Sequence, residues 1–182
     1  DTNYGLSEST GPGCVHLGVE NINKVGAIGI PGYRWECKIV DEDGNTVLHL
    51  ASMLDDADLV TYFLIKGANP TLQNYSGQTP LHLAIEYKAY NAAEILAVTN
   101  KTLFARNSDG EIALTKGLES DEAFYDIFIN EKTGLITDSN GKSILHYFVD
   151  NKNLKAVKSV ISKGLPISIR DNEGKTPLDY AF

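Results

Sequence analysis

The sequence repeats itself with a period of about 33 residues, and a period of this length limits the folds that the chain can adopt. Five segments begin with a glycine followed by a short apolar run, and their glycines are Gly44, Gly77, Gly110, Gly141 and Gly174. Each step between these glycines equals the period, except that the step from Gly110 to Gly141 is two residues shorter. A fixed period in this range is typical of a solenoid, in which one unit is too small to bury its apolar face and stacked neighbours supply the core.

Each unit carries the same order of signals for a turn and two helices. In the first unit, Asp43-Gly44 favours a turn, and an apolar run follows it directly. A second apolar segment has helical spacing, and its apolar residues are Leu59, Val60, Phe63 and Leu64. Gly67 then provides a helix stop. The pattern predicts turn, helix, helix and glycine stop in every regular unit.

Two short motifs, one at the end of the first unit and one in the second unit, carry a resemblance to a known family. Residues 79–82 read TPLH, and residues 66–69 read KGAN. These motifs resemble the ankyrin repeat family, and the resemblance covers residues 41–182. It implies an all-α ankyrin-repeat solenoid of helix-turn-helix units with short β-hairpin-like loops and an irregular N-terminal cap. It also implies that the threonine caps the first helix, that the proline lies in its first turn, and that the histidine joins neighbouring repeats by hydrogen bonds.

The resemblance divides the chain into an N-terminal segment and an array. Residues 1–40 are expected to contain a degenerate capping repeat. The array is expected to consist of repeats at residues 41–73, 74–106, 107–137 and 138–170, with a partial repeat at residues 171–182.

Three units depart from the family pattern. At residues 112–115 the third unit reads IALT in place of TPLH, so it lacks both the cap and the bridging histidine. We expect a distorted repeat there, and a bend in the stack is one form that the distortion could take. The second unit ends on VTNK at residues 98–101 in place of a glycine stop. The last unit stops at Phe182, so either one helix caps the array or the natural chain continues.

The N-terminal segment contains GPGCVHLG at residues 11–18, which lies one period before GNTVLHLA at residues 44–51. This register places His16 in the bridging slot and predicts a helix from about Cys14 to Asn21. A poor or absent second helix is predicted, because glycines and a proline interrupt the pattern at Gly26, Gly29, Pro31 and Gly32.

Cys14 and Cys37 are the two cysteines of the chain, and both lie in this segment. An even pair confined to one segment indicates a local disulfide in an oxidising compartment, whereas two free buried thiols would suit a cytoplasmic protein. The resemblance brings the start of one helix near the end of the next, so Cys14 and Cys37 could pair, and closing this loop would contribute roughly 3 kcal/mol. We therefore expect a periplasmic or secreted protein. The chain starts at Asp1, so either a leader was removed or the sequence was trimmed.

The histidines do not indicate a metal site, because they follow the repeat. His16, His49 and His82 succeed one another at one full period, and His146 lies two units beyond His82, at the same slot. In stacked units they would lie about 10 Å apart, which is too far to share one ion. The glycine-rich run at residues 26–32 lacks the Lys-Ser/Thr ending of a phosphate loop. We expect no cofactor, no metal and no catalytic activity.

Charge and hydropathy restrict the classes of partner. The net charge is −8 and the sequence pI is about 4.9, which argues against nucleic acid, because binding of phosphates depends on clustered Lys and Arg. The same charge favours a protein partner with a basic or mixed surface. The sequence contains no window of roughly 18 apolar residues, so we expect no membrane insertion. We expect a monomer when the partner is absent.

The family geometry places loop tips and first-helix ends on a concave strip that binds other proteins. Exposed Tyr and Met side chains are typical interface anchors. We expect an acidic, Tyr- and Met-containing groove formed by Glu42, Asp43, Met53, Leu54, Tyr75, Glu86, Tyr87, Asp109, Glu111 and Glu119. The alternative is that Met53, Leu54 and Tyr87 pack against a neighbouring repeat. Residues 138–170 contain six basic and two acidic residues. Of the basic ones, Lys152, Lys155 and Lys158 are expected on the outer, convex side.

These observations favour a non-catalytic protein-binding module. The eroded repeats, the acidic groove and the expected disulfide resemble bacterial exported ankyrin proteins, for which a periplasmic immunity protein that neutralises a toxin is one role. A secreted effector that engages a host protein, an accessory domain of a larger enzyme and a structural spacer are the alternatives.

Overall fold

The computed structural model describes residues 3–4, 14–15, 30–31 and 40–181. The chain divides into two compact units, Asp1–Ile39 and Val40–Phe182.

The described part of the first unit is a small antiparallel sheet. Its strands are β1 (Asn3–Tyr4), β2 (Cys14–Val15) and β3 (Ile30–Pro31), in the order β1-β2-β3. In β2, Cys14 lies opposite Tyr4 on one side and opposite Pro31 on the other. The helix predicted to begin at Cys14 is therefore wrong at its start, because Cys14 and Val15 are in extended backbone. The rest of that helix and Cys37 lie outside the described residues, so the disulfide stays a prediction.

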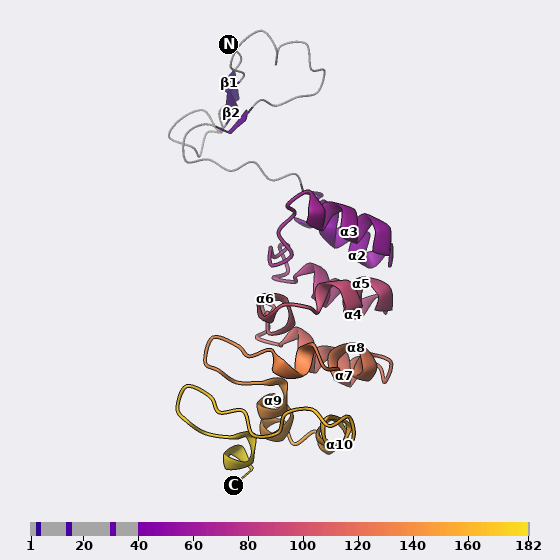
Figure 1. Ribbon diagram of the computed structural model, residues 1–182. Coiled ribbons are helices and arrows are strands. Elements are labelled where there is room, and N and C mark those ends of the chain that lie inside the picture. Colours follow the sequence, from indigo (N-terminus) through magenta and orange to yellow (C-terminus); the bar gives the residue numbers. More distant parts are fainter. Residues whose placement is uncertain (1–2, 5–13, 16–29, 32–39, 182) are drawn as a thin grey trace. The chain divides into compact units, whose positions relative to one another are not determined.

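The second unit is a stack of helix pairs, as predicted (Figure 1). The inner helices are α2 (Val47–Met53), α4 (Pro80–Glu86), α7 (Ala113–Ser120) and α9 (Ile144–Asp150). The outer helices are α3 (Ala57–Ile65), α5 (Tyr90–Leu96), α8 (Phe124–Phe128) and α10 (Leu154–Ser162). Three short helices add to the pairs: α6 (Asn100–Leu103), η1 (Thr133–Leu135) and η2 (Pro177–Tyr180).

The core follows the repeat because one slot of each inner helix holds a leucine. Leu48, Leu81, Leu114 and Leu145 occupy this slot, and all four are buried. Burying a leucine side chain contributes roughly 1.5–3 kcal/mol, so the same slot in every unit builds one continuous apolar layer. Neighbouring units also complete each other's helix ends. Ala89 precedes α5 and offers no capping oxygen, and Asp55 of the preceding unit instead accepts from the backbone N–H of Ala92 at 2.9 Å.

A loop precedes each inner helix, and we call these loops the fingers: residues 41–46, 74–79, 107–112, 138–143 and 171–176. Each finger begins with Asp or Asn, whose Oδ1 accepts backbone N–H groups two and four residues ahead. The glycine at the fourth position has a positive φ in every finger, and in the first finger it is Gly44, at 79°. Gly44 also has no room for a Cβ atom, which would lie 2.7 Å from the Tyr75 ring of the next finger. The fingers therefore stack closely as well as the helices.

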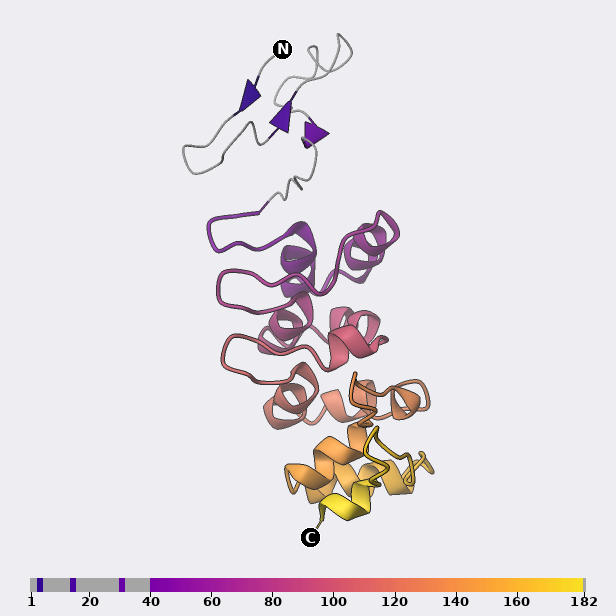
Figure 2. The ribbon, with the colours of Figure 1, turned by 90° about the vertical axis from the view of Figure 1, so that its left-hand side faces the viewer.

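The third and fourth units depart from the regular stack. In the second unit Thr99 caps α6, which takes the place of the missing glycine stop, and α8 in the third unit has only 5 residues. In both Figure 1 and Figure 2, α9 and α10 run in a different direction from the helices of the first three pairs. The distortion expected at the third unit is thus present, and it takes the form of a turned fourth pair.

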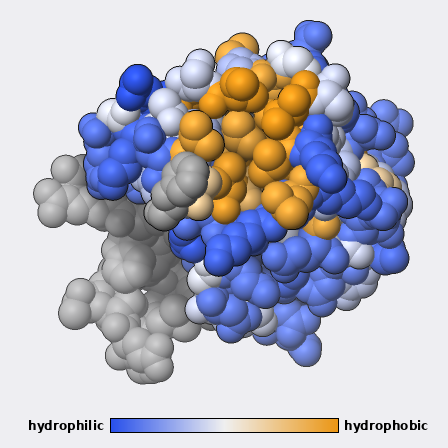
Figure 3. Space-filling view, turned by 90° about the horizontal axis from the view of Figure 1, so that it is seen from below, coloured by the Kyte–Doolittle hydropathy of each residue, from blue (hydrophilic) through white to orange (hydrophobic). Residues whose placement is uncertain are grey.

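The C-terminal end of the stack is apolar. Figure 3 shows this end as a hydrophobic area surrounded by hydrophilic residues. Leu178 in η2 occupies the leucine slot of the fifth unit and is 67% exposed, whereas Leu81 in the same slot of the second unit is fully buried.

Candidate protein-binding surface

Three histidines fix the spacing of the fingers. His49 Nε2 lies 3.0 Å from the carbonyl oxygen of Gln78 in the next finger. His82 Nε2 lies 3.3 Å from that of Glu111, and His146 Nε2 lies 3.2 Å from that of Lys175. In each link one histidine joins its own helix to the finger of the following unit. This is the bridging role that the family resemblance implied.

The hydrogen bonds define the protonation state of these rings. Nδ1 of His82 lies 3.3 Å from the backbone N–H of Thr79, which can only donate, so Nδ1 accepts and the proton is on Nε2. Nε2–H then donates to the Glu111 carbonyl. A second proton on Nδ1 would face the Thr79 N–H. Burial lowers the pKa of His82 below its usual value, in agreement with a neutral ring.

The predicted binding residues form two rows on this frame. The finger row contains Glu42, Asp43, Tyr75, Asp109 and Glu111. The helix-end row contains Met53, Leu54, Glu86, Tyr87 and Glu119, at the C-terminal ends of α2, α4 and α7.

In the finger row, Tyr75 is the large exposed side chain. It is 74% exposed, and its backbone N–H donates to the carbonyl of Asp43 at 2.9 Å. One face of its ring covers Gly44, so the ring is held by the neighbouring finger. Glu42, Asp43 and Asp109 are exposed at the tips. A tyrosine positioned in this way loses little freedom when a partner covers it.

Two of the carboxylates are held by their own unit. Glu111 accepts from Asn107 Nδ2 at 2.8 Å and from Lys116 Nζ at 3.2 Å. The hydrogen bond from Asn107, followed by that from Lys116, lowers the pKa of Glu111. Glu86 accepts from Gln78 Nε2 at 2.7 Å, and this bond connects the helix-end row to the second finger.

In the helix-end row, Leu54 is 74% exposed and Tyr87 is 54% exposed, whereas Met53 is half-buried. Glu119 is exposed and lines a shallow cavity of about 410 Å³ with Tyr125 and Lys155. The two tyrosines belong to different rows, and within residues 40–181 no ring contact joins Tyr75 to Tyr87. The surface is therefore an open strip with two rows of side chains.

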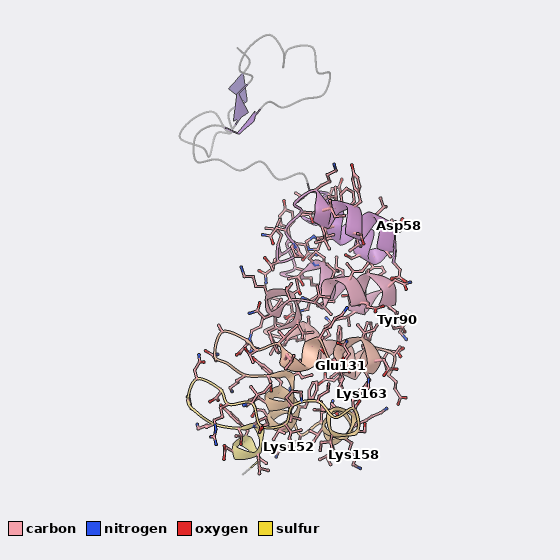
Figure 4. The ribbon with its side chains drawn as sticks, in the orientation of Figure 1. Asp58, Tyr90, Glu131, Lys152, Lys158 and Lys163 are labelled. Atoms are coloured by element: carbon pink, nitrogen blue, oxygen red, sulfur yellow. The ribbon has the colours of Figure 1, made fainter. Side chains whose placement is uncertain are left out.

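Three of the basic residues of the fourth unit, Lys155, Lys158 and Lys163, lie in the outer helix α10 or at its C-cap. Figure 4 shows Lys152, Lys158 and Lys163, and Lys163 Nζ lies 2.7 Å from Asp126 Oδ1. Lys152 and Lys158 are exposed, as expected. Lys155 does more than face solvent, because it forms an ion pair with Glu122 of the preceding unit.

Sequence reasoning missed a cavity of about 400 Å³ beside the junction of the third and fourth units, between α6 and the fourth finger. It is lined by Asn100, Lys101, Phe104, Arg106, Asp138, Ser139, Asn140 and Tyr147. The available signal was the missing histidine at Thr115, which indicated that this junction differs from the others. Within residues 40–181, no group of three or more His, Cys, Asp or Glu side chains could hold a metal ion. No helix in the same part of the chain is long and apolar enough to cross a membrane.

Comparison with known proteins gives one family. A family profile described as Ankyrin repeats (3 copies) matches residues 16–108. Neurogenic locus notch homolog protein 1 of Homo sapiens is 30% identical over 144 residues, which cover 78% of this chain and 6% of that protein. Neurogenic locus notch homolog protein 2 of Homo sapiens is 31% identical over 136 residues, which cover 73% of this chain and 6% of that protein. The chain thus spans about 6% of the length of these curated relatives.

Two solved structures are also similar. One is a predatory endopeptidase from Bdellovibrio bacteriovorus in complex with immunity protein Bd3460, with 25% identity, a TM-score of 0.48, and coverage of 81% of this chain and 79% of that chain. The other is the ankyrin repeat domain of Bcl-3, with 22% identity, a TM-score of 0.48, and coverage of 79% of this chain and 66% of that chain.

Proposed function

We propose that this chain, which belongs to the ankyrin repeat family, is a non-catalytic module that holds a partner protein. The observation that carries the proposal is the exposure of large side chains on a rigid frame. Tyr75 lies fixed against Gly44, and Leu54 and Tyr87 project from the ends of helices that the histidine bridges hold in place. Exposed aromatic and apolar side chains on a preorganised surface are the usual anchors of protein interfaces.

The charge of the strip supports a basic or mixed partner surface. Its carboxylates are Glu42, Asp43, Glu86, Asp109, Glu111 and Glu119. Charge of one sign attracts a complementary partner and excludes a similar one, and it acts mainly on the association rate. We therefore propose that association slows as salt concentration rises, because screening shortens the reach of these charges to about 8 Å at physiological ionic strength.

The test is affinity purification from the native source with matched variants. The wild type is compared with Tyr75→Ala/Tyr87→Ala and with Tyr62→Ala, which removes an exposed tyrosine from α3 on the outer side. We expect one specific partner to be lost with the double variant and retained with Tyr62→Ala. Equal capture by all three proteins would show that the strip is not the binding surface.

The narrower roles are proposals that differ in where the partner originates. An immunity protein would capture and inhibit a toxin of the same organism in the periplasm, and the acidic strip would suit a toxin with a basic surface. A secreted effector would capture a protein only from host material, and an accessory domain would copurify with an enzyme of which it is a part. Inhibition of the captured protein in an activity assay, at one-to-one stoichiometry, distinguishes immunity from the other two roles.

The proposed location depends on Cys14 and Cys37. Mass spectrometry of the native protein with and without reductant should show a mass increase of about two hydrogens on reduction if the disulfide predicted for an exported protein is present. Two free thiols in the native protein would instead favour the cytoplasm.

A further inference from the structure

The junction between the third and fourth units is open where the other junctions are closed. The first, second and fourth fingers accept a hydrogen bond from the next finger, through the carbonyls of Asp43, Ser76 and Asn140. No such bond joins the third finger to the fourth among residues 40–181. The histidine bridge is absent there too, because Thr115 occupies that position and bonds only to Ile112 of its own unit. The cavity of about 400 Å³ lies beside the fourth finger, and its opposite wall is formed by α6 and by Arg106, the residue directly before the third finger.

Two cations on the cavity wall lack a carboxylate partner. Lys101 and Arg106 are exposed, and within residues 40–181 neither makes an ion pair. Arg106 is nevertheless held in place, because its Nη1 donates to the carbonyl of Gly110 at 2.7 Å. The other guanidinium N–H groups remain available, and a guanidinium can bind a carboxylate through two parallel hydrogen bonds.

The one carboxylate of the cavity wall is already fully engaged. Asp138 Oδ1 accepts from the backbone N–H groups of Asn140 and Lys142, at 2.9 and 2.8 Å. Asp138 Oδ2 accepts from Tyr147 OH at 2.7 Å. These three neutral donors hold the Asp138 carboxylate in place without cancelling its charge. Two cations, Lys101 and Arg106, against this one carboxylate leave the cavity wall with a net positive charge in a chain of net charge −8.

An aromatic pair gives the cavity an apolar wall. The rings of Phe104 and Tyr147 are stacked with centroids 5.1 Å apart. The side-chain amides of Asn100 and Asn140 add hydrogen-bonding groups beside the cations. The wall thus combines a positive region with an aromatic surface, in a volume that suits one or two side chains.

We propose that this cavity binds an aspartate or glutamate side chain of a polypeptide, with an apolar residue next to it packing on Phe104 and Tyr147. The inference rests on the proposed function, and it gives the surface a second contact whose charge preference is opposite to that of the acidic strip. A partner would then be selected by a basic area facing the strip and an acidic residue facing the cavity.

The test uses small probes that need no knowledge of the partner. Acetyl-Asp-Phe-amide and acetyl-Asn-Phe-amide are titrated into the 15N-labelled full chain at low salt, and amide shifts are followed. We expect saturable shifts at Lys101, Arg106 and Asn140 with the Asp peptide. The Asn peptide should bind about tenfold more weakly, because it lacks the charge-assisted bonds. Lys101→Gln/Arg106→Gln should abolish the preference, and Lys66→Gln/Lys158→Gln, which removes two exposed lysines elsewhere, should keep it.

Equal binding of the two peptides, or the absence of saturable shifts at these residues, would overturn the inference. Inorganic phosphate that binds as tightly as the Asp peptide would overturn it as well, because the cavity would then take any anion. The outcome is separable from that of the proposed function. If the peptides do not bind but partner capture depends on Tyr75 and Tyr87, the proposed function holds and the inference about the cavity is wrong. If the Asp peptide binds but capture does not depend on those tyrosines, the inference about the cavity holds and the proposed binding strip is wrong.

Discussion

Replacement of His82 by alanine tests how neighbouring units are joined. The ring of His82 is completely buried between α4 and the third finger. It accepts from the hydroxyl of Thr79 at 2.8 Å and from its backbone N–H at 3.3 Å, and it donates to the Glu111 carbonyl. The Glu111 carbonyl keeps a second partner in the N–H of Asn107, but the Thr79 N–H, also buried, would lose its acceptor.

The expected loss combines two effects. A buried donor without a partner costs about 1–3 kcal/mol, and truncating a large buried side chain to alanine costs about 2–5 kcal/mol. These terms overlap, so we expect His82→Ala to lower the free energy of unfolding by about 3–5 kcal/mol. The matched control is Thr115→Ala, because Thr115 occupies the same slot in the third unit, is half-buried and makes one bond within its own helix start. Its loss should not exceed about 1 kcal/mol.

Urea unfolding followed by circular dichroism measures both values on the full chain. With a slope of about 1–3 kcal/mol per molar for a protein of this size, the two midpoints should differ by about 1 M or more. A second, earlier transition in His82→Ala would mean that the units on either side unfold separately, as expected when a nearest-neighbour link in a repeat array is broken. A loss for His82→Ala that is no larger than for Thr115→Ala would refute the assignment of the bridge.

Two further predictions concern protonation and packing. The pKa of His82 in the folded chain lies below 6.5, so the unfolded chain takes up a proton first as the pH falls. The contribution of the neutral His82 ring to stability is therefore complete above pH 6.5 and is lost as the pH falls below this value. In thermal melts, His82→Ala should lose less stability between pH 7 and pH 5 than the wild type does. A Cβ atom on Gly117 would lie 2.2 Å from Cε2 of the buried Phe128, so Gly117→Ala should destabilise by about 1–3 kcal/mol through overpacking, despite a gain of about 1 kcal/mol in helix propensity. Unchanged or raised stability of Gly117→Ala in urea, relative to Ser120→Ala on the same helix, would contradict this packing.

The regular part of the fold could be predicted because each regular unit contains its own short-range sequence signals for helix starts. Thr46, Thr79 and Ser143 precede inner helices, and the residue three positions later is a histidine in all three cases. These short-range signals recur at the period, so they specify both the helix start and the link to the next unit. The Asp or Asn at the start of each finger is an equally local signal, since its side chain closes the turn, although the sequence reasoning did not use it.

The binding surface was less predictable because exposure depends on neighbours. The sequence pattern allowed Met53, Leu54 and Tyr87 either to project or to pack. In the structure Met53 is half-buried while the other two are exposed, a difference that the pattern does not contain. At the N-terminus, the repeat register predicted a helix at Cys14, but extended pairing of β2 with β1 and β3 prevails there. The match of Cys14 and Val15 to the repeat pattern favours a helix only weakly, whereas backbone hydrogen bonds to strands on both sides favour the extended conformation.

One residue position distinguishes the inner helix of the turned fourth pair from the other three inner helices. Two residues after the histidine slot, the first three units carry Ala51, Ala84 and Gly117, and the fourth carries Phe148. In the third unit this position faces the outer helix of the same pair, because a Cβ atom on Gly117 would meet the Phe128 ring of α8. The distance between helix axes grows with the side chains at the contact. Phe148 is nevertheless buried, so α9 must accommodate a phenyl ring where its predecessors accommodate a methyl group or a hydrogen atom.

The unit that carries Phe148 directly follows the unit in which Thr115 replaces the histidine. Among residues 40–181 no hydrogen bond joins the third finger to the fourth, and Phe104 at the end of α6 stacks on Tyr147 of α9. The irregular junction thus combines a stacked aromatic pair with a neighbouring cavity. In a solenoid whose other junctions are closed by hydrogen bonds, this is where a side chain from another protein can enter the stack.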